Sequence, residues 1–221
     1  MTKPPTKRAS KKESTREAIL AAARTVMASD GPEGLSLSKV AHLAGINRGT
    51  AYQHFQTREA LVKATIGSVS EHLCTTLGSG ADIDAEGRLV GIEQRSFYET
   101  IARLVDFAIE NPTLGRIWLF EVLSSEDPSN DPFFRRFKQT TQQLADSRFS
   151  QDGIDVEALS VMTLAGYFLW PEWVRAKSRC EQDREVMAQR MRRELLRLFL
   201  HGVLRPEQFP QLEELLAQES L

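Results

Sequence analysis

The chain has 221 residues, of which 41% are hydrophobic and 26% are charged, so it can build a folded core and is neither a fibre nor a disordered tail. Its longest mostly apolar run, residues 161–170, is much shorter than the roughly 20 residues that cross a membrane, and we expect no membrane contact. The polar, basic stretch from Met1 to Arg16 lacks the apolar segment of a secretory signal, which predicts a cytoplasmic protein. Cys74 and Cys180 form no C-x-x-C pair and are expected to be reduced thiols.

Charge is divided unevenly along the chain. Residues 1–60 carry ten Lys or Arg against five Asp or Glu, a net charge of +5, whereas residues 61–221 carry 18 against 25, a net charge of -7. A basic segment joined to an acidic remainder is typical of a polyanion-binding domain with a separate body, although a solvated lysine-rich tail gives the same count.

The first helix is predicted from a capping signal. Ser14-Thr15-Arg16-Glu17 has the form of a capping box, so we expect a helix to begin at Ser14, after a flexible basic tail over residues 1–12. Asp30-Gly31-Pro32 is expected to end this helix.

Hydrophobic residues at helical spacing predict helices along nearly all of the remaining chain. The small and acidic segment 78–87 is expected to be a loop, and no segment has the alternation of a strand. The fold class is therefore all-α. The expected helices are 37–44 capped by Ser36, 48–54 capped by Asn47, 57–77 capped by Thr57, one through Phe97 to Ala108 that ends at Asn111-Pro112, 113–124, 132–148 capped by Asp131, 155–176, 182–203 and 206–218.

The two short helices between Ser36 and Phe55 have the lengths and the spacing of a helix-turn-helix. Gly45-Ile46-Asn47 joins them, with a glycine for the turn and an apolar residue to fill the angle between the helices. The second helix places Ala51 and Phe55 on a packing side and polar residues on the opposite side. A plain helical hairpin with a polar outer face would show the same spacing. No acidic residue occurs between Ser36 and Thr57, which favours approach to phosphates.

These residues resemble the tetracycline-repressor (TetR) family of bacterial transcriptional regulators. The resemblance rests on three runs: Leu37-Ser38-Lys39-Val40-Ala41, Ala44-Gly45-Ile46-Asn47-Arg48-Gly49-Thr50-Ala51-Tyr52-Gln53-His54-Phe55, and Arg58-Glu59-Ala60-Leu61. It implies a three-helix DNA-binding domain over residues 13–60 and a helical body over residues 61–221 that dimerises and binds a ligand. The chain departs from the family at Arg48 and Arg58, where lysine is common, and at Asn47, where serine or threonine is common.

Roles follow for the residues that match the family's motif. Arg48 and Gln53 are expected to read base edges in the major groove, because their paired hydrogen-bonding groups fit guanine and adenine. Gly49 is expected to let the backbone approach the DNA, and Asn47 to cap the helix. The predicted DNA-binding residues are Lys39, Asn47, Arg48, Gly49, Thr50, Tyr52, Gln53, His54 and Arg58. Lys11 and Lys12 either follow the DNA backbone or belong to a solvated tail.

The predicted helix 155–176 is apolar on almost every face, which indicates burial on all sides. With the helix that follows it, it can form half of an antiparallel four-helix interface with a second copy. The homodimer that the resemblance implies would use this interface, whereas a helix at the centre of a monomer is the alternative. The predicted interface residues are Leu159, Met162, Leu169, Trp173, Met187, Met191, Leu195 and Leu198.

Aromatic residues in the body can line a mostly apolar pocket for a small effector, although at helical spacing they can equally be core. Three polar residues, Arg116, Glu121 and Tyr167, are candidates to orient the effector. The predicted pocket residues are Phe97, Ile101, Arg116, Trp118, Phe120, Glu121, Phe137, Tyr167 and Phe168.

Enzymatic signatures are missing from the sequence. It contains no G-x-S-x-G, no phosphate-binding loop and no G-x-G-x-x-G, and the His72-Leu73-Cys74 pair has no further ligand nearby. We therefore expect no catalysis, no metal and no cofactor. The sequence indicates a homodimeric repressor that a small molecule releases from a palindromic operator in double-stranded DNA. A DNA-binding regulator without a ligand and a helical protein-binding module are the alternatives.

Overall fold

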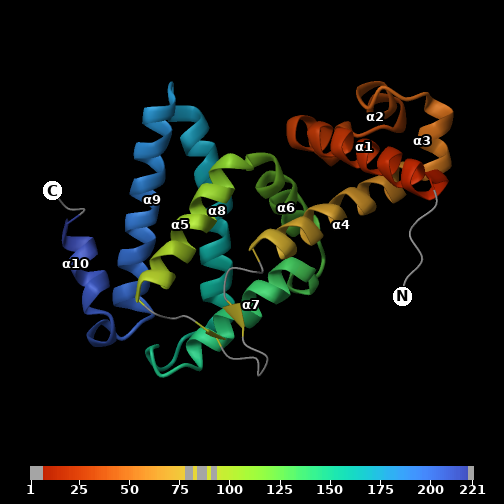
Figure 1. Cartoon of the computed structure of the whole chain (residues 1–221). Helices are drawn as coiled ribbons and strands as arrows, with labels where there is room; N and C mark the ends of the chain where they lie inside the picture. The colour runs from red at the N-terminus through yellow and green to blue at the C-terminus, as the bar shows by residue number, and fades with distance from the viewer. Residues whose placement is uncertain (1–6, 78–81, 84–88, 91–93, 219–221) are drawn as a thin grey trace.

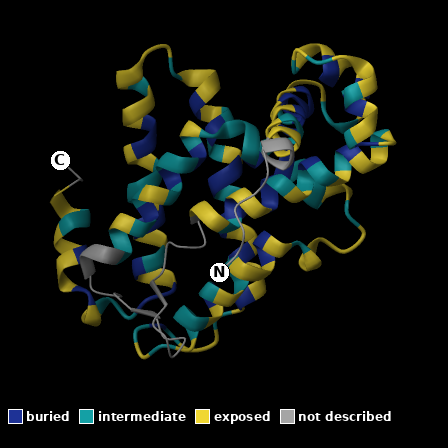
Figure 2. Ribbon diagram, turned by 45° about the vertical axis from the view of Figure 1, so that its right-hand side comes forward, coloured by how far each residue is buried: buried dark blue, intermediate teal, exposed yellow. Residues whose placement is uncertain are grey.

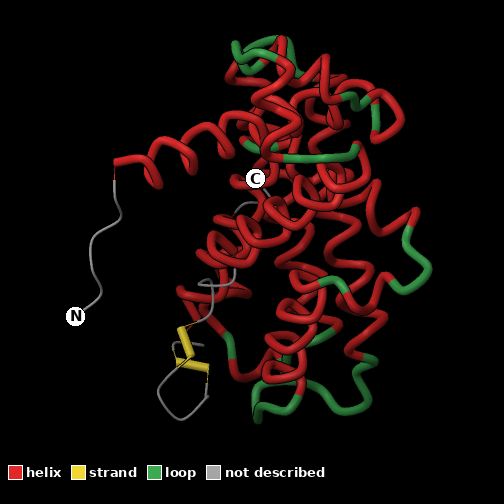
Figure 3. Tube along the Cα trace, turned by 90° about the vertical axis from the view of Figure 1, so that its right-hand side faces the viewer, coloured by secondary structure: helices red, strands yellow, loops and turns green. Residues whose placement is uncertain are grey.

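The computed structural model describes residues 7–77, 82–83, 89–90 and 94–218, and confirms the all-α class (Figures 1 and 3). The first helices are α1 (Lys7–Asp30), the 3-10 turn η1 (Pro32–Gly34), α2 (Leu37–Leu43), α3 (Arg48–His54) and α4 (Arg58–Leu77). The later elements are β1 (Asp82–Ile83), β2 (Leu89–Val90), α5 (Gln94–Glu110), α6 (Pro112–Ser124), η2 (Pro128–Asn130), α7 (Pro132–Ala145), α8 (Val156–Lys177), α9 (Glu181–Gly202), η3 (Pro206–Gln208) and α10 (Pro210–Gln218).

We call α1, α2 and α3 the head, and α4 to α10 the body. The head gathers at one end of the molecule, and α4 leaves it to enter the body (Figure 1). Apolar residues of all three head helices and of α4 form the core of the head, because each helix turns one apolar stripe inward. These fully buried residues include Ile19, Ala23, Val40, Ala51 and Leu61.

The predicted start of the first helix at Ser14 is wrong. α1 begins at Lys7, and residues 7–12, which were expected to be a flexible tail, belong to the helix. Residues 7–18 contain neither glycine nor proline, so nothing in their backbone stops the helix. The Thr15 hydroxyl donates to the Lys11 carbonyl at 2.9 Å, a bond within the helix rather than a cap.

The segment expected to be a loop contains a short ladder. β1 and β2 pair antiparallel, with Asp82 opposite Val90 and Ile83 opposite Leu89. Strands of two residues are too short to produce a visible alternation in sequence, so periodicity could not indicate them. The rest of the predicted loop 78–87 lies outside the described residues. Other boundaries shift slightly: α7 ends at Ala145, and the predicted helix 206–218 is divided into η3 and α10.

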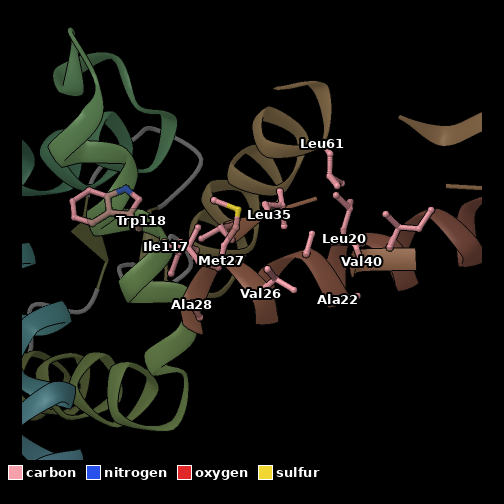
Figure 4. Packing of buried hydrophobic residues seen from close by; sticks show 14 of the residues in the cluster. Leu20, Ala22, Val26, Met27, Ala28, Leu35, Val40, Leu61, Ile117 and Trp118 are labelled. Carbon is pink, nitrogen blue, oxygen red and sulfur yellow. The ribbon is translucent and has the colours of Figure 1, made fainter. Parts of the chain in front are cut away.

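The head and the body share one hydrophobic core. α1 packs against α6, and the buried side chains Met27 and Ala28 of α1 belong to the same cluster as Ile117 and Trp118 of α6 (Figure 4). A second cluster lies farther along the body, among α5, α8, α9 and α10. The head is therefore joined to the body by α4 and also by the packed end of α1.

Candidate functional site

Local hydrogen bonds build the predicted helix-turn-helix. The Ser36 side chain accepts from the Lys39 amide at 3.2 Å, and Asn47 Oδ1 accepts from the Thr50 amide at 2.7 Å, so both predicted caps are confirmed. Between the helices Gly45 has φ +66°, a left-handed conformation that costs little for glycine alone. The Ile46 amide then donates to the Ala41 carbonyl at 3.0 Å. This turn sets the angle at which α3 crosses α2.

α3 has one packing face and one open face. Ala51 is fully buried and Phe55 nearly so, whereas the side chains on the opposite side are exposed or half-buried. The exposed residues are Arg48, Gly49, Tyr52 and Gln53, and the half-buried ones are Thr50 and His54. The Arg48 guanidinium lies 5.3 Å from the centre of the Tyr52 ring and donates to its hydroxyl at 3.2 Å. The predicted reading residues therefore share one solvent-facing surface.

Packing within the chain does not require a glycine at position 49. A Cβ built on Gly49 would meet only Asn47 Oδ1, at the ordinary contact distance of 3.4 Å. An absent side chain at this place leaves the backbone of α3 open to close approach from outside.

Two of the predicted DNA-binding cations, Lys39 and Arg58, bond to other groups of the chain. Lys39 Nζ forms an ion pair with Asp30, on the exposed surface. Arg58 Nε donates to the Leu35 carbonyl at 3.0 Å, and Arg58 Nη2 donates to the Pro32 carbonyl at 2.8 Å. These donors hold the start of α4 against the segment between α1 and α2, and contact of Arg58 with DNA stays a prediction.

Sequence reasoning missed a cation beside α3. The Arg16 guanidinium lies 5.5 Å from the centre of the Phe55 ring, which places this part of α1 next to the end of α3. Lys11 and Lys12 are exposed on the same helix, nearer its start. The unbroken helical sequence from residue 7 was the signal that could have indicated a basic helix rather than a tail.

We predict that Arg58→Ala lowers the stability of the protein, whereas Arg48→Ala does not. Removing Arg58 leaves the Pro32 and Leu35 carbonyls without a charged donor, which should lower the free energy of unfolding by about 1 to 3 kcal/mol. Arg48 is exposed and bonds only to Tyr52, so its loss should leave unfolding nearly unchanged and act on DNA binding. Urea unfolding of both variants measures the difference, and equal midpoints would contradict it.

The structure does not bring the predicted pocket residues together around one cavity. Trp118, Phe137 and Phe168 pack in the cluster shared with the head, whereas Phe97, Ile101 and Tyr167 pack in the second cluster. Arg116 pairs with Glu172, and Phe120 and Glu121 are half-buried on α6. Tyr167 and Phe168 separate because neighbours on a helix point about 100° apart. Burial, with a contribution from the nearby Asp131 charge, raises the pKa of the Glu121 carboxyl above its ordinary value.

A cavity of about 660 Å³ lies elsewhere, between α1, α4 and the start of α6. Its lining is mostly polar and includes none of the predicted pocket residues. The lining residues are Glu17, Arg24, Ser68, Glu71, His72, Thr75, Glu110, Asn111, Pro112, Thr113 and Leu114. Arg24 crosses this region, donating to Glu17 at 2.8 Å and to the Ser68 hydroxyl at 3.2 Å.

The predicted interface residues divide into three sets by exposure. Figure 2 shows that exposed and buried residues alternate along the helices of the body. Met162, Leu169, Trp173 and Leu198 are exposed by 47 to 69%, an unusual exposure for large apolar side chains. Leu159 and Met191 are half-buried. Met187 and Leu195 are buried in their own chain, so their assignment to an interface is corrected: they lie on the stripe of α9 that faces inward. Val161 and Val186 are exposed as well and were not predicted.

Within the ranges that the structure describes, no helix is long and apolar enough to cross a membrane. Across those same residues, no group of three or more His, Cys, Asp or Glu side chains is placed to hold a metal ion.

Known proteins share both a sequence segment and a fold with this chain. Residues 19–65 match the model for bacterial regulatory proteins of the tetR family. No curated protein matches the chain by sequence. Among solved structures, a gamma-butyrolactone receptor described as ArpA-like has 19% identity and a TM-score of 0.65, covering 94% of this chain and 97% of its own. A TetR-family transcriptional regulator from Pectobacterium atrosepticum has 20% identity and a TM-score of 0.56, covering 90% and 98%.

A third structure is NalD, the secondary repressor of the MexAB-OprM multidrug efflux pump in Pseudomonas aeruginosa. It has 24% identity and a TM-score of 0.55, and covers 88% of this chain and 98% of its own. At these identities the structures show a common fold, and the family match is confined to residues 19–65. Residues 19–65 thus match the DNA-binding segment of tetR-family bacterial regulatory proteins, and the chain as a whole shares the fold of solved TetR-family regulators.

Proposed function

We propose that the protein is a homodimeric repressor that binds a palindromic operator and leaves it when a small molecule binds the body. The observation that carries this proposal is the solvent-facing surface of α3, where Arg48 and Gln53 are exposed on a helix fixed by the Asn47 cap and the Gly45 turn. A helix of this kind fits the major groove of DNA, with its first residues against base edges. The protein would bind this DNA in the cytoplasm.

The surface offers both kinds of contact that specific DNA binding needs. Arg48 carries paired donors for guanine, and Gln53 carries a donor and an acceptor for adenine. Around them, the hydroxyls of Thr50 and Tyr52 suit phosphate oxygens, and no acidic residue lies between Ser36 and Thr57 to repel them. Lys11, Lys12 and Arg16 add positive charge along α1.

The exposed apolar residues of α8 and α9 support the dimer. Met162, Leu169 and Trp173 follow one another at intervals of seven and four residues, so they lie on one stripe of α8. A second copy of the same stripe would cover them in a two-fold interface. Two heads held in this way can reach successive major grooves, which lie about 34 to 36 Å apart.

Release by a ligand is supported by two proteins of similar structure, a gamma-butyrolactone receptor and a repressor of a multidrug efflux pump. A ligand-independent regulator is the second candidate, and the packing of the predicted pocket residues into two separate clusters favours it. An inducing ligand must bind the DNA-free arrangement better, and operator DNA must then weaken ligand binding by the same factor.

The first experiment is selection of bound sequences from random double-stranded DNA, followed by affinity measurements at several salt concentrations. For a regulator that neutralises several phosphates per half-site, log K should fall with log salt by about 0.9 for each phosphate contact. Affinity that barely changes with salt, or no enriched palindrome, would favour a helical protein-binding module instead.

Exchanges at Gln53 and Tyr52 separate base reading from anchoring. Gln53→Ala should relax the preference at one operator position by about 1 to 3 kcal/mol, because the lost contact is to a base edge. Tyr52→Phe should weaken every operator variant alike, because a phosphate contact carries no sequence information. Affinities across a panel of single-base operator variants measure both effects. An even loss across the panel for Gln53→Ala would assign Gln53 to the DNA backbone.

A further inference from the structure

The last turn of α1 ends with a carbonyl that its own helix does not pair. In an α-helix the carbonyl of residue i accepts from the amide of residue i+4, and four residues after Ala28 the chain has Pro32, which has no amide hydrogen. The carbonyl of Met27, one residue earlier, does find its partner in the Gly31 amide at 3.0 Å. The Ala28 carbonyl therefore needs a donor from another element.

Arg116 of α6 supplies that donor. Its Nη1 donates to the Ala28 carbonyl at 2.8 Å, across the boundary between the head and the body. The same guanidinium donates through Nε to Glu172 Oε1 at 3.1 Å and through Nη2 to that oxygen at 2.5 Å. One side chain therefore connects the end of α1 with α8, the helix that carries the exposed apolar stripe.

The packing around Arg116 is close enough to transmit a displacement. Gly115, the preceding residue, lies so near Phe168 of α8 that a Cβ would approach the ring at 2.7 Å. Burial alone would raise the pKa of the Glu172 carboxyl, but hydrogen bonds from Arg116 and Arg175 outweigh burial and hold this pKa below its ordinary value. Glu172 thus stays ionised near neutral pH and remains ion-paired with Arg116.

We infer that Arg116 is a positioning residue that fixes the angle of the head relative to α8, so that a shift of α8 moves α3. The consequence for DNA binding rests on the proposed function. The clamp itself, by which we mean Arg116 bonded to both the Ala28 carbonyl and Glu172, is a property of a single chain. A movement of α8 displaces Glu172 and, through the ion pair, the Arg116 side chain. Arg116 in turn displaces the end of α1 through its hydrogen bond to the Ala28 carbonyl.

Arg175 provides a matched control. It also donates to Glu172, at 3.2 and 3.0 Å, but its bonds stay within α8 and its side chain is 69% exposed. Arg175→Met therefore removes a cation from the same carboxylate without breaking the link to α1. Arg116→Met removes the link, and Arg116→Lys keeps the charge but lacks the planar fork that reaches both partners.

The first readout is the distance between head and body within one chain. Cysteines replace the exposed His42 on α2 and Gln139 on α7 as label sites, Cys74 and Cys180 become serine, and labelled protein is mixed with excess unlabelled protein. Double electron-electron resonance should give a narrow distance distribution for the parent and Arg175→Met, and a broader or shifted one for Arg116→Met. The distribution for Arg116→Lys should have an intermediate width. This variant therefore still tests the inference if Arg116→Met folds poorly. Unchanged distributions for both Arg116 variants, or equal broadening by Arg175→Met, would overturn the inference.

The second readout is operator affinity against salt. Arg116→Met should lower affinity about fivefold or more while leaving the salt slope unchanged, because Arg116 contacts the protein and not a phosphate. A smaller slope, or an affinity equal to that of the parent, would overturn the coupling. If the parent protein binds no DNA, the proposed function fails, and the distance measurement still decides whether Arg116 is the clamp.

Discussion

Leu169→Glu is expected to convert the protein to a monomer and to weaken operator binding by about a hundredfold or more. Leu169 is 47% exposed on the apolar stripe of α8, so a dimer built on this stripe would enclose two new carboxylates that have no partner. A monomer loses the gain from having the second head held near its half-site, which is worth about 10² to 10⁴ in affinity. Sedimentation measures the mass, and titration of the operator measures the affinity.

Leu123→Glu is the control for this prediction. Leu123 is 82% exposed near the end of α6, outside α8 and α9, so the same chemical change there should leave the dimer intact. Dimers in both variants would contradict the assignment of the interface to α8 and α9. Monomers in both would show that an added carboxylate, rather than its position, separates the chains.

Asp131→Ala is expected to lower the free energy of unfolding by about 2 to 4 kcal/mol, as the sum of a lost cap and unpaired buried donors. Asp131 Oδ1 accepts from the Phe134 amide at 2.8 Å and from Trp118 Nε1 at 3.0 Å, and Oδ2 accepts from the Ser70 hydroxyl at 2.8 Å. A single carboxylate thereby joins α4, α6 and the start of α7. Trp118 and Ser70 are both buried, so water cannot fully replace the lost acceptor.

Asp127→Ala should change the unfolding free energy by less than about 0.5 kcal/mol. Asp127 is exposed, and its side chain accepts only from the Ser129 hydroxyl. Urea unfolding of both variants at one fixed protein concentration makes the comparison, since a dimer's stability depends on concentration. A loss below about 1 kcal/mol for Asp131→Ala would show that the three donors find other partners.

The helix-turn-helix could be predicted because its determinants are local. Ser36, Asn47 and Thr57 each accept from an amide three residues later, and such pairs can be recognised from the order of residues alone. The start of α1 was misplaced for a related reason: a capping signal at Ser14 competes with helix-forming residues before it, and local patterns do not decide which effect is larger.

The long-range contacts could not be predicted from the sequence. Arg58 finds carbonyls 23 and 26 residues earlier, and Arg116 finds one 88 residues earlier, so neither partner is marked by spacing. On α9, Met187 and Leu195 face their own chain whereas Leu198 faces solvent. Periodicity identifies such stripes but does not say which one meets a neighbour in the same chain and which one meets a second chain.

The core shared by α1 and α6 limits how the head of this protein can be combined with the body of another. A chimera that joins residues 1–60 to a foreign body would set Met27 and Ala28 against side chains that did not evolve to cover them, and would leave the Ala28 carbonyl without Arg116. Exchange of the head alone therefore produces a poorly packed contact between α1 and α6, whichever operator sequence the head binds. A working chimera must carry the α6 residues Arg116, Ile117 and Trp118 along with the head, so the transferable module is discontinuous in sequence.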